Sequence, residues 1–334
     1  MDWYPAQFFN PAAPPSSPFA LLVLNQPINQ NAYTILKKHA SFTICADGGA
    51  NRLYNLMRKS GRESIELPDA IVGDLDSISP EVRKHYEDLQ VPIIYDPGQY
   101  STDVTKCLCY LRSRTQKSLN GPCSSENGAA AVAVPATAAS ASTVNENDID
   151  INVLLLGGLG GRVDQAFSLI NHLYLSSTPT PTPTPTSTST SSSSSSSPPQ
   201  TQEHRHLYLI SEESISFLLH RGRNRIHAPG GSLMGVSPPP PPSPSPSQST
   251  TTTTTTTQTT PFAENVGIIP IAGPAAITTQ GLEWDIHDWK THFGGQVSTS
   301  NHVRSEVVQV LVESEGPVLF TIELAGWLKG GGGL

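Results

Sequence analysis

The sequence predicts an N-terminal doubly wound, mainly parallel α/β sheet domain followed by a C-terminal β-sandwich. In the first two thirds of the chain, short apolar runs alternate with stretches of helical periodicity, which is typical of a parallel sheet covered by helices. From about residue 219 the apolar runs are separated by Gly, Pro and Asn and show no convincing helical period. That change indicates an all-β domain, a small sandwich or barrel.

The expected organisation is a disordered N-terminus at 1–18, the α/β domain at 19–218, the β-sandwich at 219–328 and a Gly-rich tail at 329–334. Biased segments rich in Ser, Thr, Pro, Ala or Asn interrupt both domains at about 120–148, 176–203 and 237–260. Such segments bury too little apolar surface to offset the entropy of ordering them, so we expect disordered insertions.

Composition excludes several classes of function. The net charge is −8 with a pI of about 5.6, and no Lys/Arg cluster is long enough to follow a phosphate backbone, which argues against nucleic acid as a partner. No apolar run approaches the roughly 18 residues that span a bilayer, so no membrane association is expected. The first 18 residues lack the charged and apolar regions of a signal peptide, and we expect a cytoplasmic protein.

Each strand of the α/β domain is a short apolar run, as expected for strands covered on both faces. These runs lie at 20–24, 42–46, 70–72, 91–95, 151–156 and 207–210. Between them, a helix is expected over 50–59, and a second follows Ser79, which precedes Pro80 as a cap. A third helix is expected to be capped by residues 101–103, and a fourth carries Val163 and Phe167 on one face.

Two carboxylates, Asp74 and Asp76, follow the strand at 70–72. In an extended segment the side chains at i and i+2 point to the same face, so both carboxylates can reach one point. Hard oxygen donors of this kind bind Mg²⁺, with water and substrate phosphates completing the coordination. A polar loop with two solvated Asp residues is the alternative for this segment considered alone.

Polar residues also follow the other strands of this domain. They are Asn25 and Gln26, Asp47, residues 99–103 and residues 157–164. Ligands of open α/β sheets bind outside the carboxyl ends of the strands. The sequence therefore predicts an acid-lined crevice that binds a metal–polyphosphate complex.

Asp103 and Lys106 lie three residues apart at the start of the third expected helix, so both are expected on the exposed face of its first turn. Alone, the pair is also explained by a helix cap and a surface ion pair. Beside Asp74 and Asp76, Asp103 becomes a third metal ligand and Lys106 a phosphate contact.

The segment 157–164 is a Gly-rich turn between a strand and a helix. Its backbone N–H groups can approach phosphate, helped by the positive end of the helix, and Arg162 supplies a guanidinium suited to phosphate. The spacing matches neither the dinucleotide fingerprint nor the Walker A loop, so a plain tight turn remains the alternative.

In the β domain, Trp284 is either a core residue or a stacking surface for a flat, cationic ring. Ser300 and Asn301 offer neutral hydrogen bonds to such a ring. The nearby histidines show no compact ligand spacing and are expected at the surface.

Taken together, six motifs resemble those of eukaryotic, fungal-type thiamine pyrophosphokinases, in the same order and in both domains. The motifs are 46–52, 73–77, 101–106, 157–165, 281–284 and 297–301. The resemblance implies an Mg²⁺-dependent transfer of pyrophosphate from ATP to thiamine, giving thiamine diphosphate and AMP. It also implies a homodimer with the active site between subunits.

The resemblance further implies roles for individual residues. Metal ligands would be Asp74, Asp76 and Asp103, with Asp47 supporting the site. Contacts to the nucleotide and its phosphates would come from Gln99, Thr102, Lys106, Arg162, Asp164 and Gln165. Thiamine would be bound by Trp284, Ser300 and Asn301 of the partner subunit. Departures from the family pattern are Leu75, Val104 and Val163, where Phe is common.

Two other classes of function fit the same scaffold. A non-catalytic thiamine or nucleotide sensor has no need of three metal ligands, so the intact acidic set argues against it. A metal-dependent nucleotide hydrolase would release AMP and pyrophosphate from ATP when thiamine is absent.

Overall fold

The computed structural model describes residues 1–119, 151–177, 206–228 and 260–329. The predicted insertions and the Gly-rich tail fall almost wholly outside the described residues. The chain forms two compact units. The α/β unit comprises Ser17–Ile28 and Ala40–Ser211, and the β unit comprises Met1–Ser16, Asn29–His39 and Glu212–Leu334.

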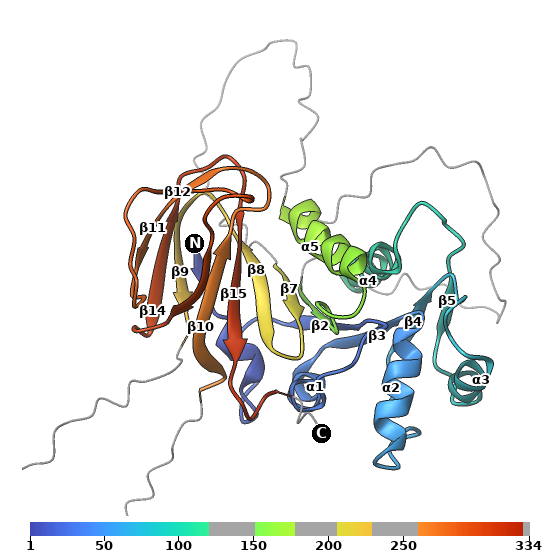
Figure 1. Ribbon diagram of the computed structural model, residues 1–334. Helices are drawn as coiled ribbons and strands as arrows, with labels where there is room; N and C mark the ends of the chain where they lie inside the picture. The colour runs from blue at the N-terminus through green and yellow to red at the C-terminus, as the bar shows by residue number, and fades with distance from the viewer. Residues whose placement is uncertain (120–150, 178–205, 229–259, 330–334) are drawn as a thin grey trace, which may run out of the picture. The chain divides into compact units, whose positions relative to one another are not determined.

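Within its described residues, the α/β unit contains a parallel sheet with the strand order β7–β6–β2–β3–β4–β5 (Figure 1). The strands are β2 (Phe19–Val23), β3 (Phe42–Ala46), β4 (Ala70–Gly73), β5 (Ile93–Tyr95), β6 (Asn152–Leu156) and β7 (Leu207–Ile210). Every residue of the central strand β2 is fully buried, which explains its continuous apolar sequence. The predicted parallel α/β sheet is confirmed.

Helices cover both faces of this sheet. They are α2 (Gly49–Arg58), α3 (Pro80–Asp88), α4 (Asp103–Leu119) and α5 (Val163–Ser177). One face carries α4, packed on β3 and β4, and α5, packed on β7, whereas α2 packs on β2 and β3 from the other face (Figure 1). The predicted caps form, because the side chain of Ser79 accepts from the N–H of Val82 and that of Thr102 from the N–H of Thr105.

The strand order of the sheet changes direction at β2. Strands β3, β4 and β5 follow on one side of β2, whereas β6 and β7 lie on the other. This arrangement makes the carboxyl ends of β2 and β6 a topological switch point, where ligands of such sheets bind. Gln26 follows β2 here, and Gly157 follows β6.

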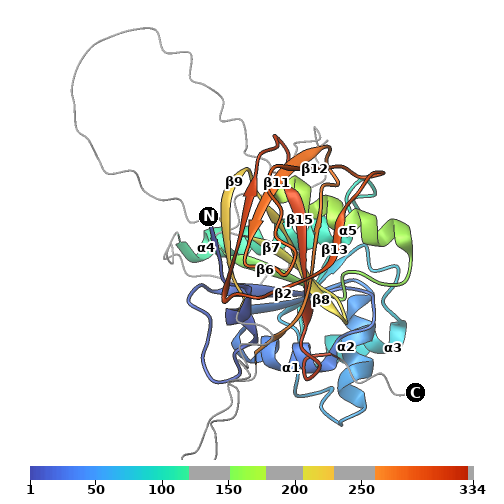
Figure 2. The same cartoon turned by 60° about the vertical axis from the view of Figure 1, so that its left-hand side comes forward.

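The described part of the β unit contains two mainly antiparallel sheets, ordered β1–β9–β14–β11–β12 and β13–β10–β15–β8 (Figure 1 and Figure 2). The strands are β1 (Asp2–Trp3), β8 (Ser214–Leu219), β9 (Gly222–His227), β10 (Phe262–Ile269), β11 (Ala275–Gln280), β12 (Trp289–Thr291), β13 (Ser298–His302), β14 (Val307–Val312) and β15 (Val318–Leu324). Burial alternates along β11 and β14, as expected for strands with one face on a core.

The N-terminal residues, expected to be disordered, are instead part of the β unit. Strand β1 pairs with β9, and the 3₁₀ helix η1 (Pro5–Phe9) follows it. Trp3 lies 4.8 Å from Phe217 between ring centroids and donates to Asn224 Oδ1 at 3.1 Å. Phe8 and Phe9 are also buried. Burying three aromatic side chains offsets the entropy of ordering this segment.

The boundary between the units also differs from the expected one at 218/219. Strand β8 belongs to the β unit, which resumes at Glu212 and also includes helix α1 (Gln30–His39). Helix α1 packs on η1, and the side chain of Asn29 donates to the carbonyl of Glu212 at 3.2 Å. Among the described helices, none is long and apolar enough to cross a membrane.

Candidate functional site

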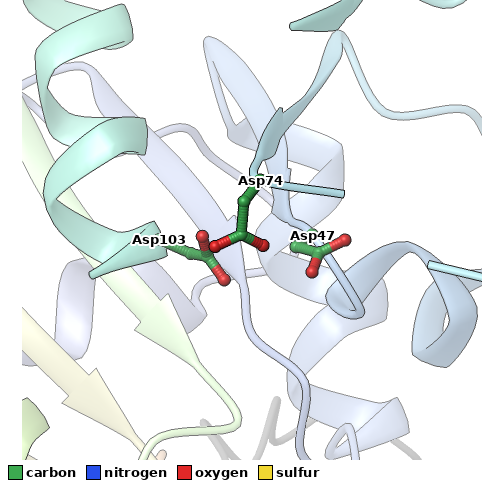
Figure 3. A group of neighbouring side chains, drawn as sticks. All are labelled: Asp47, Asp74 and Asp103. Atoms are coloured by element: carbon green, nitrogen blue, oxygen red, sulfur yellow. The ribbon is translucent and has the colours of Figure 1, made fainter. Parts of the chain in front are cut away.

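Three carboxylates meet at the carboxyl edge of the parallel sheet. Asp47 follows β3, Asp74 follows β4 and Asp103 begins α4 (Figure 3). Each offers one oxygen, and these oxygens all lie within 4.8 Å of one another. The close approach follows from the topology, because β3 and β4 are neighbours and α4 packs on both.

Asp47 is the buried member of this acidic cluster, with 1% of its surface exposed. Its backbone is in the left-handed region at φ 38°, where Asp is tolerated better than most residues. Its carboxylate accepts from the N–H of Ser77 at 2.9 Å and of Ile78 at 3.0 Å. Burial raises the pKa of Asp47, although these two hydrogen bonds oppose the shift. Asp47 therefore fixes the loop after β4 as well as facing the cluster.

A buried ammonium group balances part of this charge. Lys106 is 2% exposed, and its Nζ donates to Asp74 Oδ2 at 3.0 Å and to Asp103 Oδ1 at 3.2 Å. The hydrogen bond from Lys106 lowers the pKa of Asp74, whereas burial raises that of Asp103. Burial lowers the pKa of Lys106, but its two carboxylate partners outweigh this effect and raise it. The sequence predicted that Lys106 lies near Asp74 and Asp103, but not that it is buried; the expected exposed position was wrong, because α4 packs on β3 and β4.

Gly73 makes room for the cluster at the end of β4. A Cβ built on this residue would lie 2.7 Å from the Cβ of Asp47 and 3.1 Å from Oδ1 of Asp103. A larger residue here would therefore force either β4 or the side chains of Asp47 and Asp103 to shift. Glycine is required here for close approach.

Asp76 lies outside the acidic cluster. Leu75 adopts φ 61°, so the segment is not extended, but the side chain of Asp76 still interacts with that of Asp74. Asp76 is exposed and accepts from the Ser77 hydroxyl at 2.8 Å. A side-chain interaction between Asp76 and Asp47 raises the pKa of Asp47 after the larger effect of burial, so Asp76 still lies beside the cluster.

The hydroxyl of Thr102 caps α4 and lies 2.8 Å from Nε2 of His172, a buried residue of α5. This contact joins the first turn of α4, which carries Asp103, to the helix that follows the Gly-rich turn. Gln99, predicted to contact the nucleotide, is exposed in the loop before α4. His172 is a functional candidate that no sequence motif indicates, because it lies inside a helix without a recognisable spacing to other polar residues.

The Gly-rich turn follows β6 and leads into α5. The N–H groups of Gly157 and Gly158 both donate to the carbonyl of Ile210, at 3.0 and 3.1 Å, so these two donors are already used. Gly161, at φ 68°, approaches the side chain of Gln26, and a Cβ there would lie 2.7 Å from its Oε1. Gln26 therefore supports the turn from the neighbouring strand end at the switch point.

Three of the predicted phosphate contacts lie at the end of this turn. Arg162 Nε donates to Asp164 Oδ1 at 3.1 Å, and both side chains are mostly exposed. The hydrogen bond with Arg162 lowers the pKa of Asp164. Gln165 is also exposed. The guanidinium of Arg162 is therefore accessible to an incoming anion.

In the β unit, Asn301 lies beside Trp284, and Ser300 precedes Asn301 in β13. Trp284 is 54% exposed, which favours the stacking interpretation over a core residue. Asn301 is buried, accepts from the N–H of Trp284 at 3.2 Å and donates to its carbonyl at 2.9 Å. Ser300 is exposed at φ 56° in β13. The amide of Asn301, predicted to contact a ligand, thus holds the backbone of Trp284.

Comparisons with known proteins match two segments of the chain. The family model "Thiamin pyrophosphokinase, catalytic domain" matches residues 33–181. The model "Thiamin pyrophosphokinase, vitamin B1 binding domain" matches residues 251–319. The chain belongs to the thiamin pyrophosphokinase family. The acidic cluster lies in the segment matched by the catalytic model, and Trp284 lies in the segment matched by the binding model.

Individual members of the family match most of the chain. Thiamine pyrophosphokinase 3 of Oryza sativa is 28% identical over 316 residues, which cover 92% of this chain and 87% of the relative. The Saccharomyces cerevisiae enzyme is 28% identical over 320 residues, which cover 91% and 85%. The structure of thiamin pyrophosphokinase from Candida albicans superposes with a TM-score of 0.63 and 26% identity, covering 97% of this chain and 93% of that one.

Proposed function

We propose that this protein is a thiamine pyrophosphokinase, which transfers a pyrophosphate group from ATP to the hydroxyl of thiamine. The observation that carries this proposal is the acidic cluster with its buried lysine, within the segment that the family's catalytic model matches. The oxygen of the alcohol bonds to the β-phosphorus of ATP. The bond from that phosphorus to the oxygen shared with the α-phosphate breaks, which releases AMP, and the hydroxyl proton passes to solvent.

The donor set of the cluster fits Mg²⁺. Asp47, Asp74 and Asp103 offer hard carboxylate oxygens that lie within 4.8 Å of one another, which suits a small divalent ion that keeps several waters. When bound, Mg²⁺ neutralises charge on the phosphates and on the leaving group. Asp76 remains a predicted fourth contributor, since it lies beside Asp47.

The chain's own residues contribute positioning and charge, on which phosphoryl transfer mainly depends. Lys106 is held in place by two carboxylates before any substrate binds, so little reorganisation is needed. Arg162 is exposed and paired with Asp164. It can exchange this carboxylate for a phosphate oxygen, because guanidinium binds both with similar geometry.

The exposed indole of Trp284 supports the assignment of thiamine as the acceptor. Thiamine carries a positively charged thiazolium ring, and the face of an indole attracts a cation. Ser300 lies in β13, two residues before His302, and its hydroxyl is exposed. The ring of His302 lies next to that of Trp284. The family model that includes these residues is described as the vitamin B1 binding domain.

The activity is tested by incubating the full chain with ATP and Mg²⁺, with and without thiamine. We expect AMP and thiamine diphosphate in equal amounts when thiamine is present, and almost no AMP without it. A sensor would give no AMP in either case. A hydrolase would give AMP and pyrophosphate without thiamine. Asp103→Asn serves as the inactive control.

Magnesium binding needs a readout other than activity. We expect MgCl₂ alone to raise the thermal unfolding temperature of the parental protein and to have a much smaller effect on Asp103→Asn. Equal shifts in the two proteins would contradict a metal site at the cluster. Homodimeric assembly and a cytoplasmic location remain predictions, the first of which sedimentation analysis tests directly.

A further inference from the structure

The loop that carries Trp284 is hydrogen bonded to the end of β13 and to the residues that follow it. The N–H of Glu283 donates to the carbonyl of His302 at 2.9 Å, and the N–H of Arg304 donates to that of Gly281 at 2.9 Å. Together with the amide of Asn301, these bonds fix the backbone on both sides of Trp284. They do not fix the indole itself, which is 54% exposed.

The indole has one aromatic neighbour among the described side chains. The ring of His302 lies 5.0 Å from that of Trp284 between centroids, at an interplanar angle of 45°. Aromatic pairs at such distances are attractive beyond their buried area. His302 therefore contacts the side chain of Trp284 from the strand to which the loop is fastened.

His302 is itself held by charged groups. Its Nδ1 lies 2.7 Å from Oε2 of Glu283. Arg304 hydrogen bonds to the same carboxylate of Glu283, and also to Oε2 of Glu264 on β10 at 2.6 Å. A single guanidinium thus joins β10 to the Trp284 loop and restrains Glu283 in the orientation that meets His302.

The charge of this network suits a cationic ligand. The hydrogen bond with His302, followed by that with Arg304, lowers the pKa of Glu283, so Glu283 is ionised at neutral pH. Glu264 and Glu283 together exceed the single positive charge of Arg304 when His302 is neutral. This network consequently bears no excess positive charge that would repel a thiazolium ring.

We propose that His302, restrained by Glu283 and Arg304, is a positioning residue that sets the orientation of the Trp284 indole and thereby the affinity for the cationic ring of the substrate. This inference rests on the proposed function, in which Trp284 stacks on thiamine. Glu283 and Arg304 act through His302. In the free protein the network already holds the indole in the orientation that the ligand requires. Binding therefore costs less conformational entropy of the indole.

The test is steady-state kinetics of the full chain with thiamine and ATP varied separately. We expect His302→Ala to raise the KM for thiamine about 3- to 10-fold, the range expected for losing one aromatic pair. The kcat and the KM for ATP should stay within about twofold, because a residue that only orients a binding surface affects substrate binding before the chemical step. His302→Phe keeps the ring contact and should restore most of the affinity.

Two further variants make the test specific. Glu283→Gln removes the charged partner of His302 at an exposed position and should raise the KM for thiamine about 2- to 4-fold, as expected for a surface ion pair. It also provides the test if His302→Ala does not fold. Arg83→Ala breaks an exposed ion pair with Glu87 on α3 and should leave all constants unchanged.

An unchanged KM for thiamine in both His302→Ala and Glu283→Gln would overturn the inference. Equal losses of kcat and of affinity for both substrates would also overturn it, because they indicate a structural role. Trp284→Ala separates this failure from that of the proposed function. If only Trp284→Ala raises the KM for thiamine, the result supports stacking by Trp284 and contradicts the positioning role of His302. If the parental protein yields no thiamine diphosphate, the proposed function itself fails.

Discussion

The ammonium group of Lys106 lies 3.0 Å from a carboxylate oxygen of Asp74, and it is buried although Asp74 is partly exposed. A buried charge is stable only with a partner, and Lys106 has two, Asp74 and Asp103. The two ion pairs therefore hold the ammonium group of Lys106 in place beside the acidic cluster, where the proposed reaction brings a triphosphate.

Lys106→Met should remove the ammonium group from the acidic cluster. We expect kcat to fall at least 100-fold, as for the loss of one preorganised donor to developing charge. We also expect a free energy of unfolding lower by about 2 kcal/mol, less than for a fully buried ion pair because both carboxylates remain partly in water. Rates and urea unfolding measure the two effects. Lys84→Met, at an exposed position of α3, should change neither.

Asp47 and Asp76 should respond differently to loss of charge. In Asp47→Asn one amide hydrogen-bond acceptor must serve the N–H groups of both Ser77 and Ile78. We therefore expect a loss of about 1–3 kcal/mol in stability, the cost of an unsatisfied buried donor, together with loss of turnover. Asp76→Asn, at an exposed position, should unfold like the parental protein but lose turnover. Parental rates for Asp76→Asn would remove Asp76 from the proposed metal site.

Gly73→Ala tests whether the cluster depends on close packing. The new Cβ would lie 2.7 Å from the Cβ of Asp47, so either the strand or the carboxylates must move, at a typical cost of about 1–3 kcal/mol. We expect lower stability and a weaker rise in unfolding temperature with Mg²⁺. Gly326→Ala, where a Cβ meets nothing within 4 Å, is the control. Parental Mg²⁺ affinity in Gly73→Ala would show that the site tolerates displacement.

The parts of the site that the sequence predicted are those fixed by topology. A polar residue at the carboxyl end of a parallel strand must lie near those of the neighbouring strands. Asp47, Asp74 and Asp103 accordingly converge, as the apolar runs before them indicated. Lys106 follows from helical spacing, because i and i+3 lie on one face. These inferences need only the order of elements and their periodicity.

The parts that the sequence did not predict depend on single backbone angles and distant partners. The left-handed conformation of Leu75 turns the segment from Asp74 to Asp76 out of the extended form, and nothing in a Leu side chain signals it. Trp3 is ordered by Asn224, 221 residues away, so a local pattern rich in Pro suggested disorder. Asn301 bonds to the backbone of Trp284 across 17 residues, which spacing alone does not reveal.

The ordered N-terminus leads to a prediction about acid stability. Asp2 bonds to Arg225 at 2.7 Å and lies 2.9 Å from His227. These partners lower the pKa of Asp2 from 3.8 to about 2. Because the folded pKa lies below that of the unfolded chain, the ionised carboxylate stabilises the fold above pH 4, and this contribution is lost as the pH falls from about 4 toward 2.

Asp2→Asn should therefore be less stable than the parental protein at pH 7, and the difference should shrink between pH 4 and pH 3. Urea unfolding at pH 7, 5, 4 and 3 measures it, with the exposed Asp88→Asn on α3 as the control. The expected difference is modest, because the ion pair is partly exposed and screened by salt. A difference that stays constant down to pH 3 would mean that the charge of Asp2 does not hold β1 against β9, and that Trp3 and its aromatic neighbours alone anchor the segment.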